Sequence, residues 1–178
     1  MERVSRGFSI LLEEEDAIRI FGTRLRISRL ASVPQKNRRN RLICDSTAPP
    51  PGGDSLLPPQ HRHKFPDLLP TQPVNASTDT SSAPLSMQFG ACLPRLLQDI
   101  WEANPADGPV LLSKWDISDG FHRCLIRPED VGAFTYVVPP LPGDTVIYLC
   151  IDLVLPMGWV NSPPFFCAAS EKSRNILE

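Results

Sequence analysis

Proline is distributed unevenly along this chain, and its distribution limits where a core can form. Nine of the twenty prolines lie between Thr47 and Pro84, among Ser, Thr, Gly and Gln. Proline lacks a backbone N–H, so it is excluded from helix interiors and central strands. A stretch so poor in apolar residues cannot bury enough surface to offset the entropy lost on ordering. We expect a long irregular connection there, draped over a folded body or partly disordered, with the fold built from its two flanks.

Upstream and downstream of this connection, the sequence has patterns typical of a hairpin and a helix. Two apolar-alternating runs, Leu25–Val33 and Arg41–Cys44, are joined by the basic segment "PQKNRRN" and predict a β-hairpin. Apolar residues recur at helical spacing over 93–101, with Pro94 in the first turn. This pattern predicts an amphipathic helix that packs on another element.

Three more strands and a second helix are predicted towards the C-terminus. Ser162 is suited to cap that helix and Pro163 to occupy its first turn. The order is hairpin, connection, helix, strand, hairpin, helix, which predicts an α+β fold with helices on one face of an antiparallel sheet. With 178 residues, one domain is expected. The three predicted strands are Val110–Ile117, Ala133–Val138 and Val146–Leu155.

Charge is unevenly distributed although the formal net charge is only −2. Residues 17–44 contain eight Lys or Arg and no Asp or Glu. Arginine grips phosphate with two parallel hydrogen bonds, and lysine acts as a point charge. The residue pattern leaves two interpretations open, a solvated surface or a phosphate-binding patch at the hairpin tip. The tip cations are Lys36, Arg38, Arg39 and Arg41.

Cysteine usage and hydropathy suggest where the protein resides. Five cysteines are widely spaced without a C-x-x-C pair, and no leader or lipidation motif is visible. The longest uncharged run, 153–170, is interrupted by prolines, unlike a membrane helix. We therefore expect an intracellular protein, cytoplasmic or nuclear, without a membrane partner.

The segment "SKWDISDGFHR" at 113–123 places Asp116 at the end of a predicted apolar strand. A buried carboxylate is costly unless a cation or metal neutralises it. Mg²⁺ prefers one or two carboxylates and leaves its other positions to water and phosphates. Asp119 and Gly120 follow in a turn whose amides could receive a triphosphate. The D-x-x-D-G pattern also occurs in ordinary surface turns, so the segment alone leaves both interpretations open.

Three segments together resemble one family. "SKWDISDGFHR" resembles the first catalytic motif of retroelement reverse transcriptases, and "LVLPMGWVNSPPFF" is similar to their Leu-Pro-x-Gly-x-x-x-Ser-Pro segment. "RLICD" at 41–45 resembles the fingers strand that precedes these motifs. The resemblance runs from about Arg24 to Glu178 and is closest to retrotransposon enzymes. It implies an RNA-directed DNA polymerase, using Mg²⁺, with a nucleic-acid template-primer and deoxynucleoside triphosphates as partners.

The resemblance also implies a role for each matching residue. Asp116 would be the catalytic, metal-binding aspartate, with the Ile117 carbonyl as a neighbouring metal ligand. Phe121 would be the steric gate that rejects a ribose 2′-OH. Arg41 and Lys36 would hold phosphates from the fingers side. The implied nucleotide-binding residues are Lys36, Arg41, Asp119, Gly120, Phe121, Met157 and Gly158.

The resemblance divides the chain into four parts and is incomplete. The expected parts are an N-terminal extension at 1–23, a fingers-like hairpin at 24–46, a Pro-rich connection at 47–85 and a partial palm at 86–178. Retroviral relatives often have Gln where Met157 stands. The family's aromatic-x-Asp-Asp motif should follow the helix after Ser162, yet the sequence has no Asp-Asp pair and ends at Glu178. Half of the protein ligands of a metal pair are therefore missing.

Three interpretations follow from this incompleteness. The chain could be an active polymerase if another chain donates the missing carboxylates. It could instead be a fingers-and-palm fragment that is inactive alone, which we favour. The alternative from a different class is a non-catalytic nucleic-acid-binding remnant that uses the basic hairpin, since phosphate contacts need no catalytic metal. The sequence does not determine the oligomeric state or the template preference.

Overall fold

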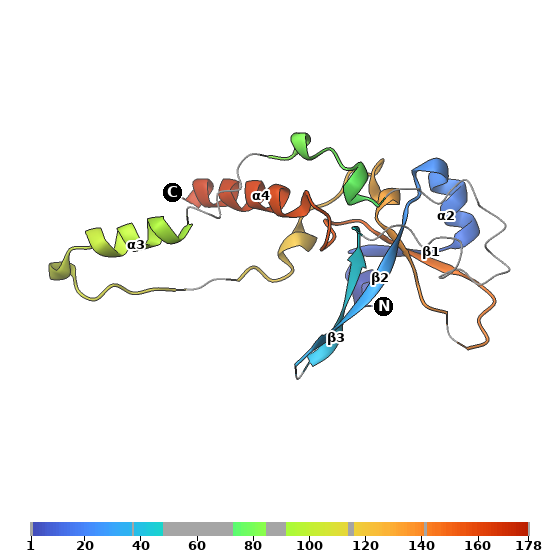
Figure 1. The fold of residues 1–178 in the computed structure, drawn as a ribbon, viewed down its shortest axis with the longest axis horizontal. Coiled ribbons are helices and arrows are strands. Elements are labelled where there is room, and N and C mark those ends of the chain that lie inside the picture. Colours follow the sequence, from blue (N-terminus) through green and yellow to red (C-terminus); the bar gives the residue numbers. More distant parts are fainter. Residues whose placement is uncertain are drawn as a thin grey trace.

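The computed structural model describes residues 2–36, 38–47, 73–84, 92–113, 116–140 and 142–177. They form an α+β fold around a five-stranded sheet with the strand order β1-β5-β4-β2-β3 (Figure 1). The strands are β1 Ser9–Glu13, β2 Ile27–Gln35, β3 Arg38–Asp45, β4 Thr135–Val137 and β5 Tyr148–Asp152. The α-helices are α1 Glu2–Ser5, α2 Glu14–Phe21, α3 Cys92–Glu102 and α4 Ser162–Leu177. No helix in this described part is both long and apolar enough to cross a bilayer.

The hairpin of β2 and β3 confirms the prediction made from its alternating pattern. The two strands pair antiparallel, with Leu30 opposite Cys44. Their register shifts between Val33 and Gln35. Pro34 lies at this irregularity, as expected for a residue that cannot donate to the strand ladder. In Figure 1 the hairpin projects beyond the rest of the sheet.

The sheet is mixed, so the prediction of a wholly antiparallel sheet is wrong. β4 and β5 pair antiparallel, as the Pro- and Gly-rich turn between them predicts. β2 and β4 instead pair in parallel, with Ile27 opposite Thr135. Parallel neighbours need a long crossover, and the chain between Asp45 and Thr135 supplies one.

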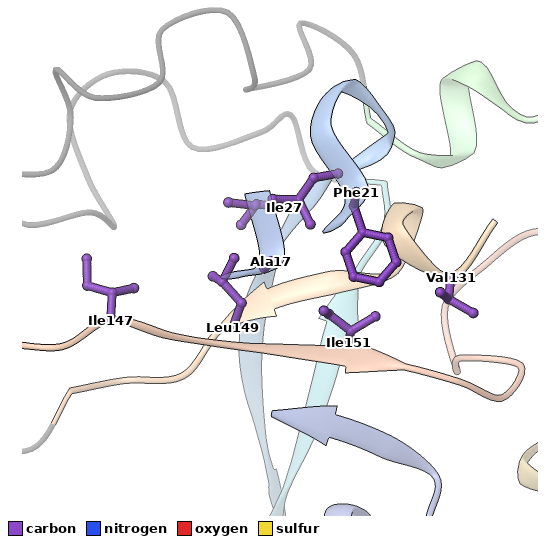
Figure 2. Packing of buried hydrophobic residues seen from close by; sticks show 8 residues of the cluster. Ala17, Phe21, Ile27, Val131, Ile147, Leu149 and Ile151 are labelled. Carbon is purple, nitrogen blue, oxygen red and sulfur yellow. The ribbon is translucent and has the colours of Figure 1, made fainter. Parts of the chain in front are cut away.

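The core lies where α2 packs on the sheet. Figure 2 shows Phe21 of α2 pointing towards Ile151 of β5, with Ala17 near Leu149. Leu149 and Ile151 are fully buried. Burying such a side chain stabilises the fold by about 1.5–3 kcal/mol. The cluster comprises Ala17, Phe21, Leu25, Ile27, Val131, Ile147, Leu149 and Ile151.

Residues 2–23, which the sequence marks as an N-terminal extension, contribute α1, β1 and α2 to this fold. β1 pairs antiparallel along β5, with Leu11 opposite Cys150. α2 follows immediately and supplies two of the core side chains. The acidic residues at 13–16 stand at the start of α2, where the helix dipole favours negative charge.

The predicted strand Val110–Ile117 is wrong for the residues of that range that the structure describes, 110–113 and 116–117. Leu111 is 87% exposed and Leu112 is 67% exposed. A continuous apolar run forms a strand only when neighbours cover it. β1 occupies the free side of β5, and no described strand pairs with 110–113.

Both predicted helices are present. α3 begins near Pro94 and ends before Asn104, but its apolar residues are exposed, so its expected packing is not observed among the described residues (Figure 1). α4 begins at Ser162. The Ser162 hydroxyl donates to the Pro156 carbonyl at 2.7 Å rather than capping the helix, because the side chain is buried beside the preceding loop.

Candidate functional site

A pocket of about 500 Å³ lies between the 116–122 segment and α4. It brings together Asp116 and Phe121 of the segment at 113–123, called here the first motif, and Met157 of the segment at 153–166, called the second motif. Phe166 of α4 forms another side of the pocket. Residues separated by about 40 positions therefore line one hollow. The described lining residues are Asp116, Ile117, Asp119, Gly120, Phe121, His122, Met157, Phe166 and Ser170.

The local turn that presents Asp119 is tight. The Gly120 amide donates to the Ile117 carbonyl at 3.1 Å. Asp119 has φ 56° and ψ 35°, the left-handed conformation, which aspartate tolerates better than most residues. In this conformation the Gly120 amide and the Ile117 carbonyl are directed at each other rather than at a ligand. The carbonyl keeps a second lone pair.

Gly120 and Phe121 anchor the turn to α4. A Cβ added at Gly120 would lie 2.9 Å from the Phe166 ring, so only glycine fits there without displacement. The Phe121 and Phe166 rings meet edge to face with centroids 5.2 Å apart. Aromatic pairs of this geometry contribute about 0.5–1.5 kcal/mol beyond their buried area. The pocket wall formed by Phe121 is thus held by packing.

The two aspartates of the motif differ in environment. Asp116 is exposed and makes no ion pair with another described residue. Asp119 is partly buried, and its Oδ2 lies 2.8 Å from Nη2 of Arg6. Its Oδ1 lies 3.7 Å from Nδ1 of His122. Of the two aspartates, Asp116 is therefore the one whose charge no described residue compensates.

Behind His122 lies a buried polar cluster that sequence reasoning missed. Asp152 on β5 accepts from the Ser9 hydroxyl at 2.7 Å and lies 3.2 Å from Arg3. Burial raises the pKa of Asp152 despite the nearby Arg3 guanidinium. Burial, followed by the charge of Arg3, lowers the pKa of His122. These partners are more than 100 positions apart, so no local pattern could have indicated them.

Gly158 supports the second motif without lining the pocket. Its φ is 111°, and a Cβ would lie 2.8 Å from the Cys44 carbonyl oxygen on β3. The side-chain amide of Asn75 donates through Nδ2 to the Gly158 carbonyl at 2.9 Å. Its Oδ1 accepts from the Val160 backbone N–H at 2.9 Å. The end of the Pro-rich connection is therefore fastened to this motif, which the sequence did not indicate.

The predicted phosphate-binding cations lie on the hairpin. Lys36 is exposed at the turn between β2 and β3. Arg41 pairs with Val33 through the backbone of β3, and its side chain lies outside what the structure describes. None of the described residues lining the pocket is Lys or Arg. The structure therefore does not bring these two cations to the pocket in the described part.

The donors at the pocket fit Mg²⁺ only in part. No group of three His, Cys, Asp or Glu residues among the described residues could hold a metal ion. Asp116 offers one carboxylate that no described residue neutralises. One carboxylate completed by water and nucleotide phosphates is a common Mg²⁺ arrangement, whereas a bare metal site needs more protein ligands. The residues at the pocket thus fit a Mg²⁺ ion that is already coordinated by the phosphates of a bound nucleotide.

A second pocket, of about 700 Å³, is lined in part by Trp159, Phe134 and Phe165. Trp159 stacks on Phe165 and meets Phe134 edge to face. The polar groups here already bond to one another: Trp159 Nε1 donates to the Thr78 hydroxyl at 2.9 Å, and Asn161 donates to the Asp79 carbonyl at 3.1 Å. We assign no chemistry to this pocket.

Comparisons with known proteins do not assign a family. A scan against protein-family models finds no match, and a search of curated proteins finds no significant match.

Proposed function

We propose that this chain is a nucleotide-binding fragment of a reverse-transcriptase-like domain. It would derive from an enzyme that adds deoxynucleotides to a primer by two-metal phosphoryl transfer, and it would be inactive alone. The observation that supports this most is the shared pocket. Asp116, Phe121 and Met157 come from two motifs selected by resemblance alone, and they line one hollow of about 500 Å³. A hollow of this size is within the range of small-ligand sites.

Each residue has a definite task under this proposal. Asp116 would hold a nucleotide-bound Mg²⁺, which supplies charge neutralisation of the phosphates when it is bound. Phe121 would lie beside the sugar, where its contact with Phe166 limits its movement and leaves no room for a 2′-OH. Met157 would contact the nucleotide through apolar surface. We do not propose that this chain catalyses the reaction by itself, because its sequence has no Asp-Asp pair to supply the remaining metal-binding carboxylates.

Titration calorimetry with Mg²⁺ and dATP tests the proposal. Asp116→Asn is expected to weaken binding at least tenfold, or about 1.4 kcal/mol. Asp107→Asn is the matched control, since Asp107 is exposed and outside the pocket, and should leave binding unchanged. Phe121→Ala should strengthen ATP binding relative to dATP. Absence of saturable Mg²⁺-dATP binding to the unmodified chain would overturn the proposal.

The second candidate function is non-catalytic nucleic-acid binding by the hairpin. The run of eight cations without an acid at 17–44, with Lys36 exposed at the tip, favours it. Such binding would be independent of sequence and sensitive to salt.

Fluorescence anisotropy with a single-stranded oligonucleotide distinguishes this candidate. Lys36→Glu should weaken binding at low salt and reduce the slope of log K against log salt by about 0.7 or more, one phosphate contact. Asp116→Asn should not change it. If the unmodified chain does not bind at low salt, this candidate is excluded.

A further inference from the structure

The N-terminal segment reaches the candidate nucleotide site through Arg6. Arg6 follows α1, and its guanidinium lies 2.8 Å from Asp119 on the pocket wall. The same guanidinium lies 5.1 Å from the centre of the Phe8 ring, which in turn lies 4.9 Å from the His122 ring. Arg6, Phe8 and His122 thus contact one another in a row beside Asp119. Arg6 and Phe8 lie outside both motifs, whereas His122 belongs to the segment at 113–123.

Two positively charged or chargeable groups face the Asp119 carboxylate, and they are not equivalent. Arg6 approaches Oδ2 at ion-pair distance, while His122 is 3.7 Å from Oδ1, too long for a hydrogen bond. Nδ1 of His122 is buried and has no hydrogen-bond partner among the described residues. Arg3 lies 3.5 Å from the other ring nitrogen. Arg6 is therefore the main counter-charge of Asp119.

This pairing has a consequence for an anion that enters the pocket. Asp116 and Asp119 both line it, and no described lining residue is a cation. A triphosphate would meet two negative charges if Asp119 were unpaired. With Arg6 in place, the Asp119 charge is compensated and its left-handed backbone is held by a contact from outside the turn. Among the described lining residues, Asp116 is then the carboxylate that remains available to Mg²⁺.

We propose that Arg6 is a positioning residue of the nucleotide site. It compensates and holds Asp119, so that Asp116 is the one carboxylate among the described lining residues that is left to bind nucleotide-borne Mg²⁺. This inference rests on the proposed function. It adds a residue from the N-terminal segment, outside the range of the family resemblance. Arg6 acts through Asp119 and does not itself contact the nucleotide.

Calorimetric affinities for Mg²⁺-dATP test this role. Arg6→Ala is expected to weaken binding about five- to tenfold, and Arg6→Lys to restore most of the loss. Arg19→Ala is the matched control: Arg19 also pairs with an aspartate, Asp16, but on the exposed face of α2 away from the pocket, and its loss should change nothing.

A double-mutant cycle excludes a purely structural effect. In the Asp119→Asn background, Arg6→Ala should have no further effect on Mg²⁺-dATP affinity, because the charge that Arg6 compensates is gone. If Arg6→Ala weakens binding equally in both backgrounds, the positioning role is wrong. If the unmodified chain binds Mg²⁺-dATP and Arg6→Ala binds equally well, the inference fails while the proposed function stands. If the unmodified chain does not bind, both fail.

An NMR titration of His122 gives a readout that needs no nucleotide and applies even if Arg6→Ala is unstable, since Arg6→Lys can be measured too. The groups that face His122 are Arg3, Asp119 and Asp152. Releasing Asp119 from Arg6 should let it support the protonated imidazole and raise the pKa of His122. Arg6→Lys should raise it less. An unchanged His122 pKa in both variants would contradict the pairing.

Discussion

The sheet and the segment from α3 to residue 113 contain similar apolar side chains but bury them very differently. In the sheet, Leu149 and Ile151 are fully buried beneath α2. In α3, Trp101 is 88% exposed. α3 nevertheless has the regular apolar spacing of a packed helix. Apolar periodicity therefore predicts that a helix forms, whereas burial depends on whether another part of the chain covers it.

The largest expected change in stability comes from a substitution in the buried core of the sheet. Leu149→Ala should lower the free energy of unfolding by about 2–5 kcal/mol, because it removes a fully buried side chain and leaves a cavity. Urea unfolding followed by circular dichroism measures it. A loss below about 1 kcal/mol would mean that α2 does not cover β5 as Figure 2 shows.

The next effect concerns the join between the second motif and the hairpin. Gly158→Ala should destabilise the fold by about 1–3 kcal/mol, since it combines a positive φ with a Cβ 2.8 Å from the Cys44 carbonyl oxygen. Gly108→Ala is the matched control, because Gly108 has φ 105° but nothing within 4 Å. Gly108→Ala should destabilise the fold less than Gly158→Ala. The difference between the urea midpoints of the two variants measures the effect of the clash with the Cys44 carbonyl oxygen. Equal losses would contradict the contact.

A smaller effect should appear in the pH dependence of stability. The lowered pKa of His122 means that folding disfavours its protonated form, mainly through burial. The stability associated with neutral His122 is present above its unfolded pKa of about 6.5 and is lost as the pH falls below it. Between pH 7.5 and 5.5, the unmodified chain should lose more stability than His122→Gln. If the urea midpoints of the two proteins changed equally with pH, folding would not disfavour the protonated form of His122.

The smallest effect is expected in the exposed half. Leu97→Ala on α3 should change the free energy of unfolding by less than about 0.5 kcal/mol, because more than half of the residue's surface is already exposed. The same urea experiment as for Leu149→Ala measures it. A loss comparable to the core variant would mean that α3 packs against another surface in solution, which would remove the contrast between the two regions.

Much of the local structure was predictable from sequence because its signals are local. The hairpin alternates over Leu25–Val33 and ends at a basic turn, and α4 begins at Ser162 and Pro163. Part of the pocket lining was predictable from sequence, since the two motifs contain Asp116, Phe121 and Met157, which line it together.

The remainder depends on contacts between distant parts of the chain. β1 has the composition of an ordinary amphipathic segment, and only its pairing with β5 makes it a strand. The ion pairs of Arg3 and Arg6 link residues over 100 positions apart. The run at 110–112 has the composition of a buried strand, but no described neighbour pairs with it, so its composition was misleading.

The fastening at Asn75 bears on how this chain could tolerate changes in length. The backbone N–H of Asn75 donates to the Ser46 carbonyl at 3.0 Å, and its side-chain amide donates to the Thr47 hydroxyl at 2.9 Å. Thr47 and Asn75 are therefore held next to each other although 28 positions separate them. The entropic cost of closing a chain between two fixed points rises by only about 0.6 kcal/mol for each doubling of its length. An insertion between these two points should therefore cost the fold little.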